Sequence, residues 1–303
     1  MRFASIERQG RAIPALWLTE GVLDLAAAAR LAGERAAPES VLEIIRGGAA
    51  SYDSCARLAA RASQLQDALI PHAGVKLLAP IPQPPRNIFC VGRNYLDHVK
   101  EGYQARGGEL KLPEVPQFFT KATHTANAPD GDVRLDTRLT QLFDYEVELV
   151  VVIGSGGRDI AAARAFEHIF GYTVGNDFTA RDLQRRHDQW FKGKSLDTSF
   201  PFGPCIVDRA ELGDPSTLEL TLSVNGEERQ RARVAQMIFD IPTIIASLSA
   251  GLTLEPGDLI STGTPSGVGF AMTPRQALRG GDLVIASIDR IGALENRIVD
   301  VTA

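Results

Sequence analysis

The alternation of hydrophobic and polar positions divides the chain into two regions. The first region, up to about residue 75, is rich in alanine, leucine and arginine. Helices are predicted there near Val22–Ala32 and Ser54–Leu69. Ahead of them, Arg2–Ile6 and Ile13–Leu18 are predicted to form a short hairpin around a turn at residues 9–10.

A proline-dense connector, Leu78–Arg86, separates the two regions. Proline restricts its own backbone and that of the preceding residue, so regular structure is interrupted here. We therefore predict a small N-terminal α/β domain over residues 1–78 and a larger domain over residues 79–303.

From Asn87 onward, short apolar segments are separated by glycine and proline turns, a pattern typical of strands. The predicted strands are Ile88–Val91, Gln117–Thr120, Glu146–Ile153, Gly171–Val174, Cys205–Asp208, Leu218–Val224, Leu259–Thr262 and Leu283–Ile288. The predicted helices are Ile160–Phe170 (with Asp159 as N-cap), Ala180–Phe191 and Ile241–Leu248. Strands outnumber helices and no βαβ alternation is sustained. The pattern therefore favours an α+β protein with a β-rich mixed sandwich or roll over a doubly wound sheet.

One of these strands carries acidic residues at alternate positions. Asp144, Glu146 and Glu148 precede the apolar run Leu149–Ile153, which reads as a buried strand. Side chains alternate across a strand, so the three carboxylates share one face with Cα atoms roughly 6.6 Å apart. A divalent cation would offset their repulsion and desolvation, and oxygen ligands suit Mg²⁺, Mn²⁺ or Ca²⁺. An edge strand with a solvated acidic face also explains the pattern, and the strand taken alone favours it over a metal site; both interpretations stay open here.

Composition narrows the protein class. The 303 residues are 44% hydrophobic and 23% charged, which is typical of a globular protein with a substantial core. With a net charge of −5 and no long basic cluster, no nucleic-acid or anionic-membrane partner is expected. Three widely spaced cysteines indicate neither a disulfide framework nor a zinc site. No signal peptide or membrane-spanning run is recognised, so a cytoplasmic location is expected.

Three further polar groups are candidates for chemistry. Asp177 lies 29 positions after Glu148, and one strand–helix–strand unit would bring the two together, although an Asn-Asp turn explains it as well. His98 and Glu101 are spaced i, i+3, which suits a histidine general base oriented by a carboxylate, or else an exposed surface turn. Lys194 could face an anionic substrate or be simply solvated. The glycine-bearing stretch 102–108 could order over a ligand as a lid.

Several nucleotide and nucleophile motifs are excluded. The letters GKS at 193–195 lack the first glycine of a P-loop, because Asp188 stands there. The loop after residue 153 lacks the third glycine of a dinucleotide motif, because Asp159 stands there. A second glycine-rich loop, Gly263–Gly269, either holds a carboxylate through its backbone N–H groups and Thr264 or is a plain turn. No GxSxG elbow is present.

Taken together, the motifs resemble the fumarylacetoacetate hydrolase family over roughly residues 86–300. The matching segments are Gly92-Arg-Asn-Tyr-x-x-His98-x-x-Glu101, Asp144-Tyr-Glu146-x-Glu148, Gly175-Asn-Asp177-x-Thr-Ala-Arg-Asp182, Gly193-Lys194-Ser-x-Asp-Thr198, Pro201-x-Gly203-Pro204 and Thr262-Gly-Thr264-Pro-x-Gly-Val-Gly269. Six motifs in order are far more specific than any one of them.

The resemblance implies a β-rich roll, usually a homodimer, with Mg²⁺ or Mn²⁺ (Ca²⁺ is possible) bound by Glu146, Glu148 and Asp177, and with Asp144 outside this set. It implies a His98–Glu101 dyad on a mobile lid, with Lys194 beside the substrate. Residues expected to contact substrate are Arg93, Tyr95, Lys121, Gln184 and Thr264.

Members of the family act on 2-oxo acids, so we expect a small 2-oxo acid substrate. Our first hypothesis is hydrolysis of a C–C bond in a 2,4-dioxo acid such as an acylpyruvate, through a water activated by His98 and Glu101 and an enolate stabilised by the ion. The alternatives are isomerisation, tautomerisation or decarboxylation of a 2-oxo or hydroxy-diene dicarboxylate, as with oxaloacetate, and a noncatalytic Ca²⁺-binding module. The chain departs from the usual family pattern at Lys121–His124 and in the unusually charged segment Arg185–Asp188, and both bear on substrate choice.

Overall fold

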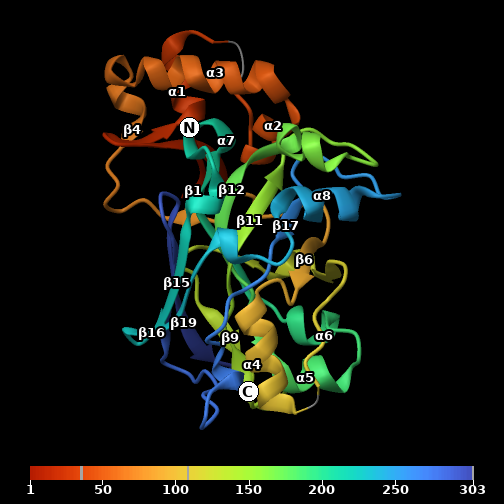
Figure 1. The fold of residues 1–303 in the computed structure, drawn as a ribbon. Helices are drawn as coiled ribbons and strands as arrows, with labels where there is room; N and C mark the ends of the chain where they lie inside the picture. The colour runs from red at the N-terminus through yellow and green to blue at the C-terminus, as the bar shows by residue number, and fades with distance from the viewer. Residues whose placement is uncertain (35–36, 108, 302–303) are drawn as a thin grey trace.

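The computed structural model describes residues 1–34, 37–107 and 109–301 and is an α+β protein built on open, mixed sheets (Figure 1). The main sheet has 12 strands. Its path runs β4 (Leu69–Ile70), β3 (Gly21–Asp24), β2 (Arg11–Leu18), β1 (Arg2–Arg8), β14 (Phe200–Asp208), β12 (Ile169–Asn176), β11 (Val147–Ile153), β17 (Leu259–Ser261), β6 (Ile88–Gly92) and β7 (Gln117–Lys121), with β5 (Leu77–Leu78) beside β1 and β8 (Ala126–Asn127) beside β14.

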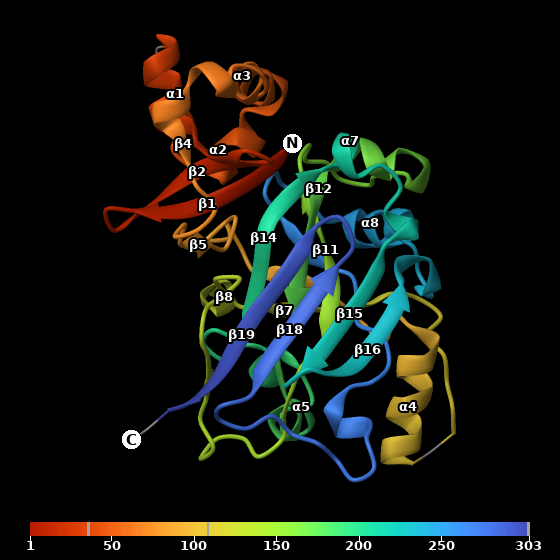
Figure 2. The same ribbon diagram turned by 90° about the vertical axis from the view of Figure 1, so that its left-hand side faces the viewer.

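A second sheet of five strands packs against one face of the main sheet (Figure 2). Its order is β16 (Glu227–Arg233), β15 (Glu219–Val224), β18 (Leu283–Ile288), β19 (Gly292–Asp300) and β9 (Val133–Leu135). A two-stranded pair joins β10 (Phe143–Asp144) to β13 (Thr179–Ala180). The sandwich expected from the strand-rich pattern is confirmed.

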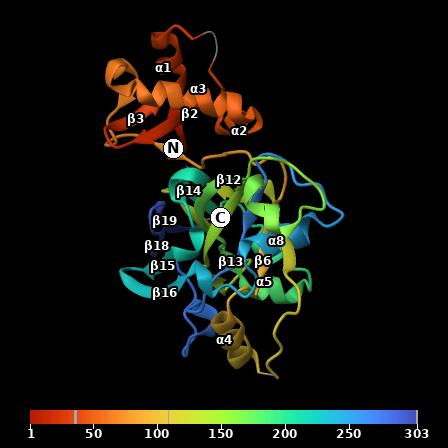
Figure 3. The same ribbon diagram turned by 45° about the horizontal axis from the view of Figure 1, so that its top comes forward.

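The α-helices are short and lie around the sheets. They are α1 (Leu25–Ala32), α2 (Val41–Arg46), α3 (Gly48–Ala60), α4 (Leu96–Arg106), α5 (Arg181–Arg186), α6 (Phe191–Lys194), α7 (Arg209–Leu212) and α8 (Ile241–Ser249). Short 3₁₀ helices are η1 (Ala62–Gln64), η2 (Gln66–Ala68), η3 (Thr123–Thr125), η4 (Ala162–His168), η5 (Pro215–Thr217), η6 (Val234–Gln236) and η7 (Gly269–Ala271). Helices α1–α3 gather at one end of the molecule and α4 lies at the other (Figure 3). No helix among the described residues is long and apolar enough to cross a membrane.

Strand β11 is a central strand, buried on both faces. It lies between β12 and β17, and every residue from Phe143 to Ile153 is buried. Leu149 and Val151 face the core shared with the five-stranded sheet, while Val150 and Val152 face the core shared with α1–α3. Burial on both faces explains the continuous apolar run, and the interpretation of an exposed acidic edge strand is wrong.

The N-terminal hairpin is confirmed as β1 and β2, and it continues the main sheet because β1 pairs with β14. The chain therefore crosses residue 78 within one sheet, and the division into two domains there stays a prediction. The helix expected at Val22–Ala32 begins only at Leu25, since Gly21–Asp24 pairs with β2 and Asp24 caps α1.

Two other helix predictions are wrong in part. The segment Ile160–Phe170 forms the 3₁₀ turn η4, and its last residues pair with β11 as part of β12. Asp159 has φ of 53° and accepts a hydrogen bond from the Gly251 N–H, so it caps no α-helix. The expected Ala180–Phe191 helix is split into α5 and α6 around Asp188, whose φ is 50°. At the first of these segments, strand pairing outweighs local helix preference.

Candidate metal centre and active site

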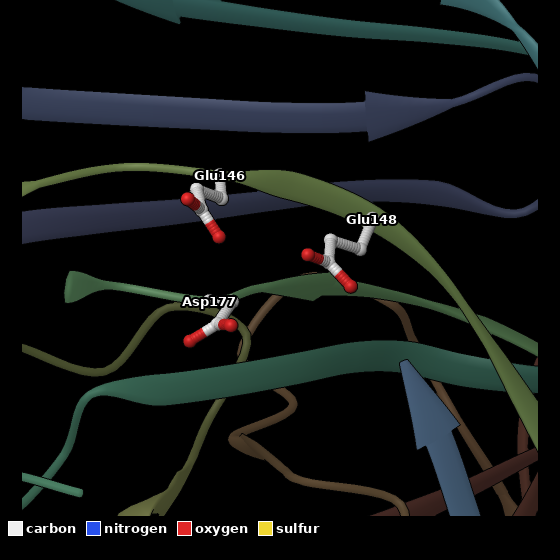
Figure 4. Close-up of side chains that lie close together, drawn as sticks. All are labelled: Glu146, Glu148 and Asp177. Carbon is white, nitrogen blue, oxygen red and sulfur yellow. The ribbon is translucent and has the colours of Figure 1, made fainter. Parts of the chain in front are cut away.

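Three carboxylates converge at the N-terminal end of β11 (Figure 4). Glu148 lies in β11, Glu146 in the break between β10 and β11, and Asp177 directly after β12. The antiparallel ladder pairs Glu148 with Gly175, and the Asp177 N–H donates to the Glu146 carbonyl at 2.9 Å. One ligand oxygen from each carboxylate lies within 4.8 Å of the others, and all three residues are buried.

Lysines supply part of the compensating charge. The Lys194 Nζ lies 2.6 Å from Glu146 Oε2 and 2.7 Å from Asp177 Oδ2. Burial alone would raise the pKa of Glu146, but Lys194 and Arg181 lower it to about 2. Burial also disfavours the charged form of Lys194, yet Asp177 and Glu146 hold its pKa above the usual value. Glu146 is therefore charged and paired without any added ion.

Glu148 is the poorly compensated member of the cluster. Burial, and then the charges of Asp177 and Glu146, raise its pKa well above the usual range. Its Oε2 accepts hydrogen bonds from the Ser261 hydroxyl at 2.5 Å and the Gly263 N–H at 2.8 Å. A buried oxygen-only cluster with excess negative charge fits a divalent cation such as Mg²⁺ or Mn²⁺.

Asp144 belongs to a neighbouring ion pair. Its Oδ2 lies 2.9 Å from Arg181 Nε, and Arg181 Nη1 lies 2.7 Å from Glu146 Oε1. Asp144 is not part of the group whose oxygens converge. The sequence missed the role of Arg181, although it stands in the motif that follows Asp177. The one available signal was that Asp144 shares a strand face with Glu146 and would need a counter-ion there.

The glycine-rich loop 263–269 does hold carboxylates, and they belong to the protein itself. The N–H groups of Gly263, Gly267 and Gly269 donate to Glu148, Glu101 and Asp144 respectively, each at 2.8 Å. Gly267 has φ of +105°, and a Cβ there would meet the Arg229 carbonyl at 1.8 Å, so only glycine fits. One loop thus fixes acidic groups from α4, β10 and β11.

The predicted dyad forms on α4. His98 Nδ1 lies 2.8 Å from Glu101 Oε1, while Glu101 Oε2 accepts the Gly267 N–H. Because Nδ1 is occupied by the carboxylate, Nε2 is the ring nitrogen available to a substrate. His98 lines the pocket that also contains Glu146 and Glu148.

The structure brings most of the predicted site residues into this pocket. Those on its lining are Arg93, His98, Glu146, Glu148, Gln184, Lys194 and Thr264. Aromatic residues that the sequence did not single out, Phe119, Trp190 and Phe270, complete the walls.

Lys121 and Tyr95 lie outside the lining, in contrast to the substrate contact expected for them. Lys121 is fully buried, and its Nζ lies 2.8 Å from Asp177 Oδ1 and also donates to the carbonyl of Lys194. Burial is the main reason why its pKa is lowered. Tyr95 is 2% exposed, and its hydroxyl has no partner among the described residues. Lys121 thus supports Asp177 from behind the pocket wall.

The chain is similar in sequence to a known family and to curated proteins. Residues 87–299 match the family model described as fumarylacetoacetate (FAA) hydrolase C-terminal. The chain is 43% identical over 304 residues to oxaloacetate tautomerase YisK of Bacillus subtilis, covering 98% of this chain and 100% of that protein. It is 37% identical over 264 residues to the human mitochondrial oxaloacetate tautomerase FAHD2A, covering 86% of this chain and 80% of that protein.

Two solved structures resemble this protein over nearly its whole length. A fumarylacetoacetate hydrolase from Exiguobacterium antarcticum superposes with a TM-score of 0.81 at 38% identity, covering 99% of this chain and 100% of that one. Maleylpyruvate hydrolase from Sphingobium sp. SYK-6, solved in complex with manganese(II) ion and pyruvate, superposes with a TM-score of 0.75 at 27% identity, with both chains covered fully.

Proposed function

Because the chain belongs to the fumarylacetoacetate hydrolase family, we propose that it is a metal-dependent tautomerase acting on a small 2-oxo dicarboxylate of the oxaloacetate type. Our first expectation was C–C bond hydrolysis. The two curated relatives described above are oxaloacetate tautomerases, and this supports the isomerase alternative better. The homodimer expected from the resemblance stays a prediction.

The observation that carries the proposal is a proton-transfer group facing the carboxylate cluster across one pocket. His98 has Nδ1 held by Glu101 at 2.8 Å and lines the pocket together with Glu146 and Glu148. Tautomerisation needs a base that removes a proton next to a carbonyl, and a neutral histidine oriented by a carboxylate suits this step. A noncatalytic Ca²⁺-binding module would have no use for the dyad.

Each group in the pocket would have a separate role in the reaction. A divalent ion held by Glu146, Glu148 and Asp177 supplies Lewis-acid polarisation of the 2-oxo group when bound. His98 Nε2 takes a proton from C3, the C–H electron pair forms the C2–C3 double bond, and the carbonyl π pair moves to the C2 oxygen. His98 then returns the proton to that oxygen, which gives the enol. Lys194, which lines the pocket, stabilises negative charge developing on the oxygen by its positive charge.

The test follows the approach of oxaloacetate to keto–enol equilibrium by ultraviolet absorbance, with Mg²⁺, with Mn²⁺ and after chelation. We expect rapid equilibration with either ion, little after chelation, and a large loss in His98→Ala. An equal rate in His98→Ala and in the unaltered protein would refute the role of the dyad. Absence of any metal-dependent acceleration would refute the proposal.

Hydrolysis is the second candidate, supported by the likeness to a solved maleylpyruvate hydrolase. It is measured on the same preparation with acetylpyruvate and fumarylpyruvate, by the appearance of pyruvate together with acetate or fumarate. Turnover of either substrate that exceeds oxaloacetate tautomerisation would favour the hydrolase.

A further inference from the structure

Arg185 is a pocket residue to which neither the motifs nor the dyad assign a task. It lies on α5, four positions after Arg181, so one helical turn separates the two and both face the same side. Both line the pocket that contains the carboxylate cluster. The sequence marked this region only as unusually charged.

The two arginines share one aromatic platform but differ in their partners. The guanidinium carbon of Arg181 lies 5.3 Å from the centroid of the Phe270 ring, and that of Arg185 lies 5.2 Å from it. Arg181 is committed to Asp144 and Glu146. Among the residues that the structure describes, Arg185 forms no ion pair and no side-chain hydrogen bond. Stacking on an aromatic face orients a guanidinium while leaving its N–H edge free for a planar anion.

The platform itself is fixed relative to the cluster. Phe270 follows the glycine-rich loop, and its N–H donates to Asp144 Oδ2 at 3.1 Å. Since Asp144 also binds Arg181, and Arg181 binds Glu146, a chain of ion pairs ties the position of the ring to the proposed metal ligands. The Arg185 guanidinium thus contacts a ring whose backbone is tied to the same group of residues.

The spacing of Arg181 and Arg185 along α5 can be compared with the length of a short dicarboxylate. Four residues of α-helix advance about 6 Å along the axis, so Arg185 lies about one turn beyond the arginine that contacts Glu146. The terminal carbons of an extended four-carbon acid are about 4 Å apart, given bonds of about 1.5 Å. One hydrogen bond adds about 3 Å, so such an acid with one hydrogen bond spans about 7 Å, a length that side chains on adjacent turns of a helix can bridge.

Arg93 is the other pocket arginine without an ion pair among the described residues, and its surroundings differ. Its guanidinium carbon lies 5.8 Å from the Trp190 ring and 6.0 Å from the ring of Tyr103 on α4. Its backbone has φ of 57°, an unfavourable conformation for a residue with a side chain. Arg93 thus packs toward the helix that carries His98, whereas Arg185 is linked to the metal ligands.

We propose that Arg185 binds the second carboxylate of a four-carbon 2-oxo dicarboxylate and so selects dicarboxylates over 2-oxo acids with a neutral end. This inference rests on the proposed function, because it takes the first carboxylate and the 2-oxo oxygen to lie at Glu146, Glu148 and Asp177. Arg185 acts on substrate choice and takes no part in the proton transfer.

The test compares two unreactive ligands that share a 2-hydroxy acid head. Malate carries a second carboxylate, whereas 2-hydroxybutyrate ends in a methyl group. Their affinities for the Mn²⁺-loaded protein are measured by isothermal titration calorimetry for the unaltered chain and for Arg185→Gln, Arg185→Lys, Arg186→Gln and Arg93→Gln. Arg186 is the matched control, since it is the next residue, is exposed like Arg185 and does not line the pocket.

The unaltered protein should bind malate more tightly than 2-hydroxybutyrate. Arg185→Gln should lose roughly 10- to 100-fold in malate affinity, the range for one charge-assisted ion pair, with less than a twofold change for 2-hydroxybutyrate. Arg185→Lys should retain part of the preference, and Arg186→Gln all of it. In oxaloacetate kinetics the KM of Arg185→Gln should rise while kcat stays within about twofold, as expected when a contact serves binding in both ground and transition states.

Three results would overturn the inference: unchanged malate affinity in Arg185→Gln, equal losses for both ligands, or loss of the preference in Arg93→Gln but not in Arg185→Gln. If the protein fails to equilibrate oxaloacetate, the proposed function falls. The calorimetric comparison of malate with 2-hydroxybutyrate then still decides whether Arg185 binds a second carboxylate.

Discussion

Replacing Glu148 by glutamine tests whether the carboxylate cluster is arranged to bind a cation. Glu148 is 1% exposed, and burial together with the charges of Asp177 and Glu146 raises its pKa. Glutamine keeps the size of the side chain and an acceptor oxygen for Ser261 and Gly263, but it removes the charge. The substitution therefore isolates electrostatics from packing.

The expected magnitude follows from the geometry. The ligand oxygens lie within 4.8 Å of one another, and a pair of unit charges at that distance interacts by about 3 kcal/mol at an effective dielectric constant of about 20. Two such repulsions act on Glu148, and attraction to Lys194 offsets roughly one of them, so removing the charge relieves about 3 kcal/mol. Weakening two charge-assisted hydrogen bonds costs about 1 kcal/mol each. The metal-free variant should thus be more stable by about 1 kcal/mol, which raises Tm by about 2 °C in a chain of this size.

Metal should reverse the order of stability. At a free ion concentration of about 100 times Kd, the unaltered protein gains about 2.7 kcal/mol, while a variant with tenfold weaker binding gains only about 1.4 kcal/mol. Differential scanning calorimetry with Mg²⁺, with Mn²⁺ and with a chelator measures both effects. Glu101→Gln is the matched control, since its carboxylate binds His98 and Gly267 and no proposed ligand. A lower Tm of Glu148→Gln in chelator would refute the repulsion argument, and an undiminished metal shift would refute its role as a ligand.

Three further predictions concern the surrounding residues. His98→Ala should lower kcat for tautomerisation about 100- to 10,000-fold while leaving the metal-induced Tm shift intact; a lost shift would mean that the site itself is disturbed. Lys121→Met should lower the free energy of unfolding in urea by about 1–3 kcal/mol, because Asp177 keeps only Lys194 as a partner and the buried carbonyls of Lys194 and Phe178 lose their donor, and a loss under about 0.5 kcal/mol would contradict the supporting role. Hydrogen bonds from Thr140 and the backbone outweigh burial and lower the pKa of Asp182. Its contribution is therefore present above the unfolded pKa of about 3.9 and is lost as pH falls through the folded value. Asp182→Asn should cost about 1 kcal/mol at pH 7 and progressively less as the pH falls below about 3.9, and a pH-independent cost would contradict this assignment.

The features that could be predicted from the sequence were those set by the spacing of residues within one element or between neighbouring elements. Alternation along β11 placed Glu146 and Glu148 on one face, and the short distance in sequence to Asp177 allowed one strand pairing to bring it alongside. The i, i+3 spacing of His98 and Glu101 likewise predicted their contact. Each of these relations depends on one element or on two neighbouring ones.

The features that the sequence did not predict depend on partners far along the chain. Whether β11 is central or exposed depends on β17, more than 100 residues later. The same holds for the carboxylates bound by the N–H groups of Gly263 and Gly269, which local patterns could not distinguish from an external ligand. Lys121 was expected at the substrate because its family position suggested it, and only the packed structure shows its ammonium group buried behind Asp177.

The two hydrogen bonds of Glu101 link the position of α4 to the orientation of His98. One oxygen of this side chain orients His98, and the other accepts the N–H of Gly267 in the loop opposite. The hydrogen bond between α4 and the glycine-rich loop is therefore made by the same side chain that orients His98. If α4 moved away from the loop, the hydrogen bond between Glu101 and Gly267 would break, and the carboxylate that orients His98 would no longer be fixed. In the proposed reaction, one carboxylate therefore couples the position of α4 against the glycine-rich loop to the orientation of the base.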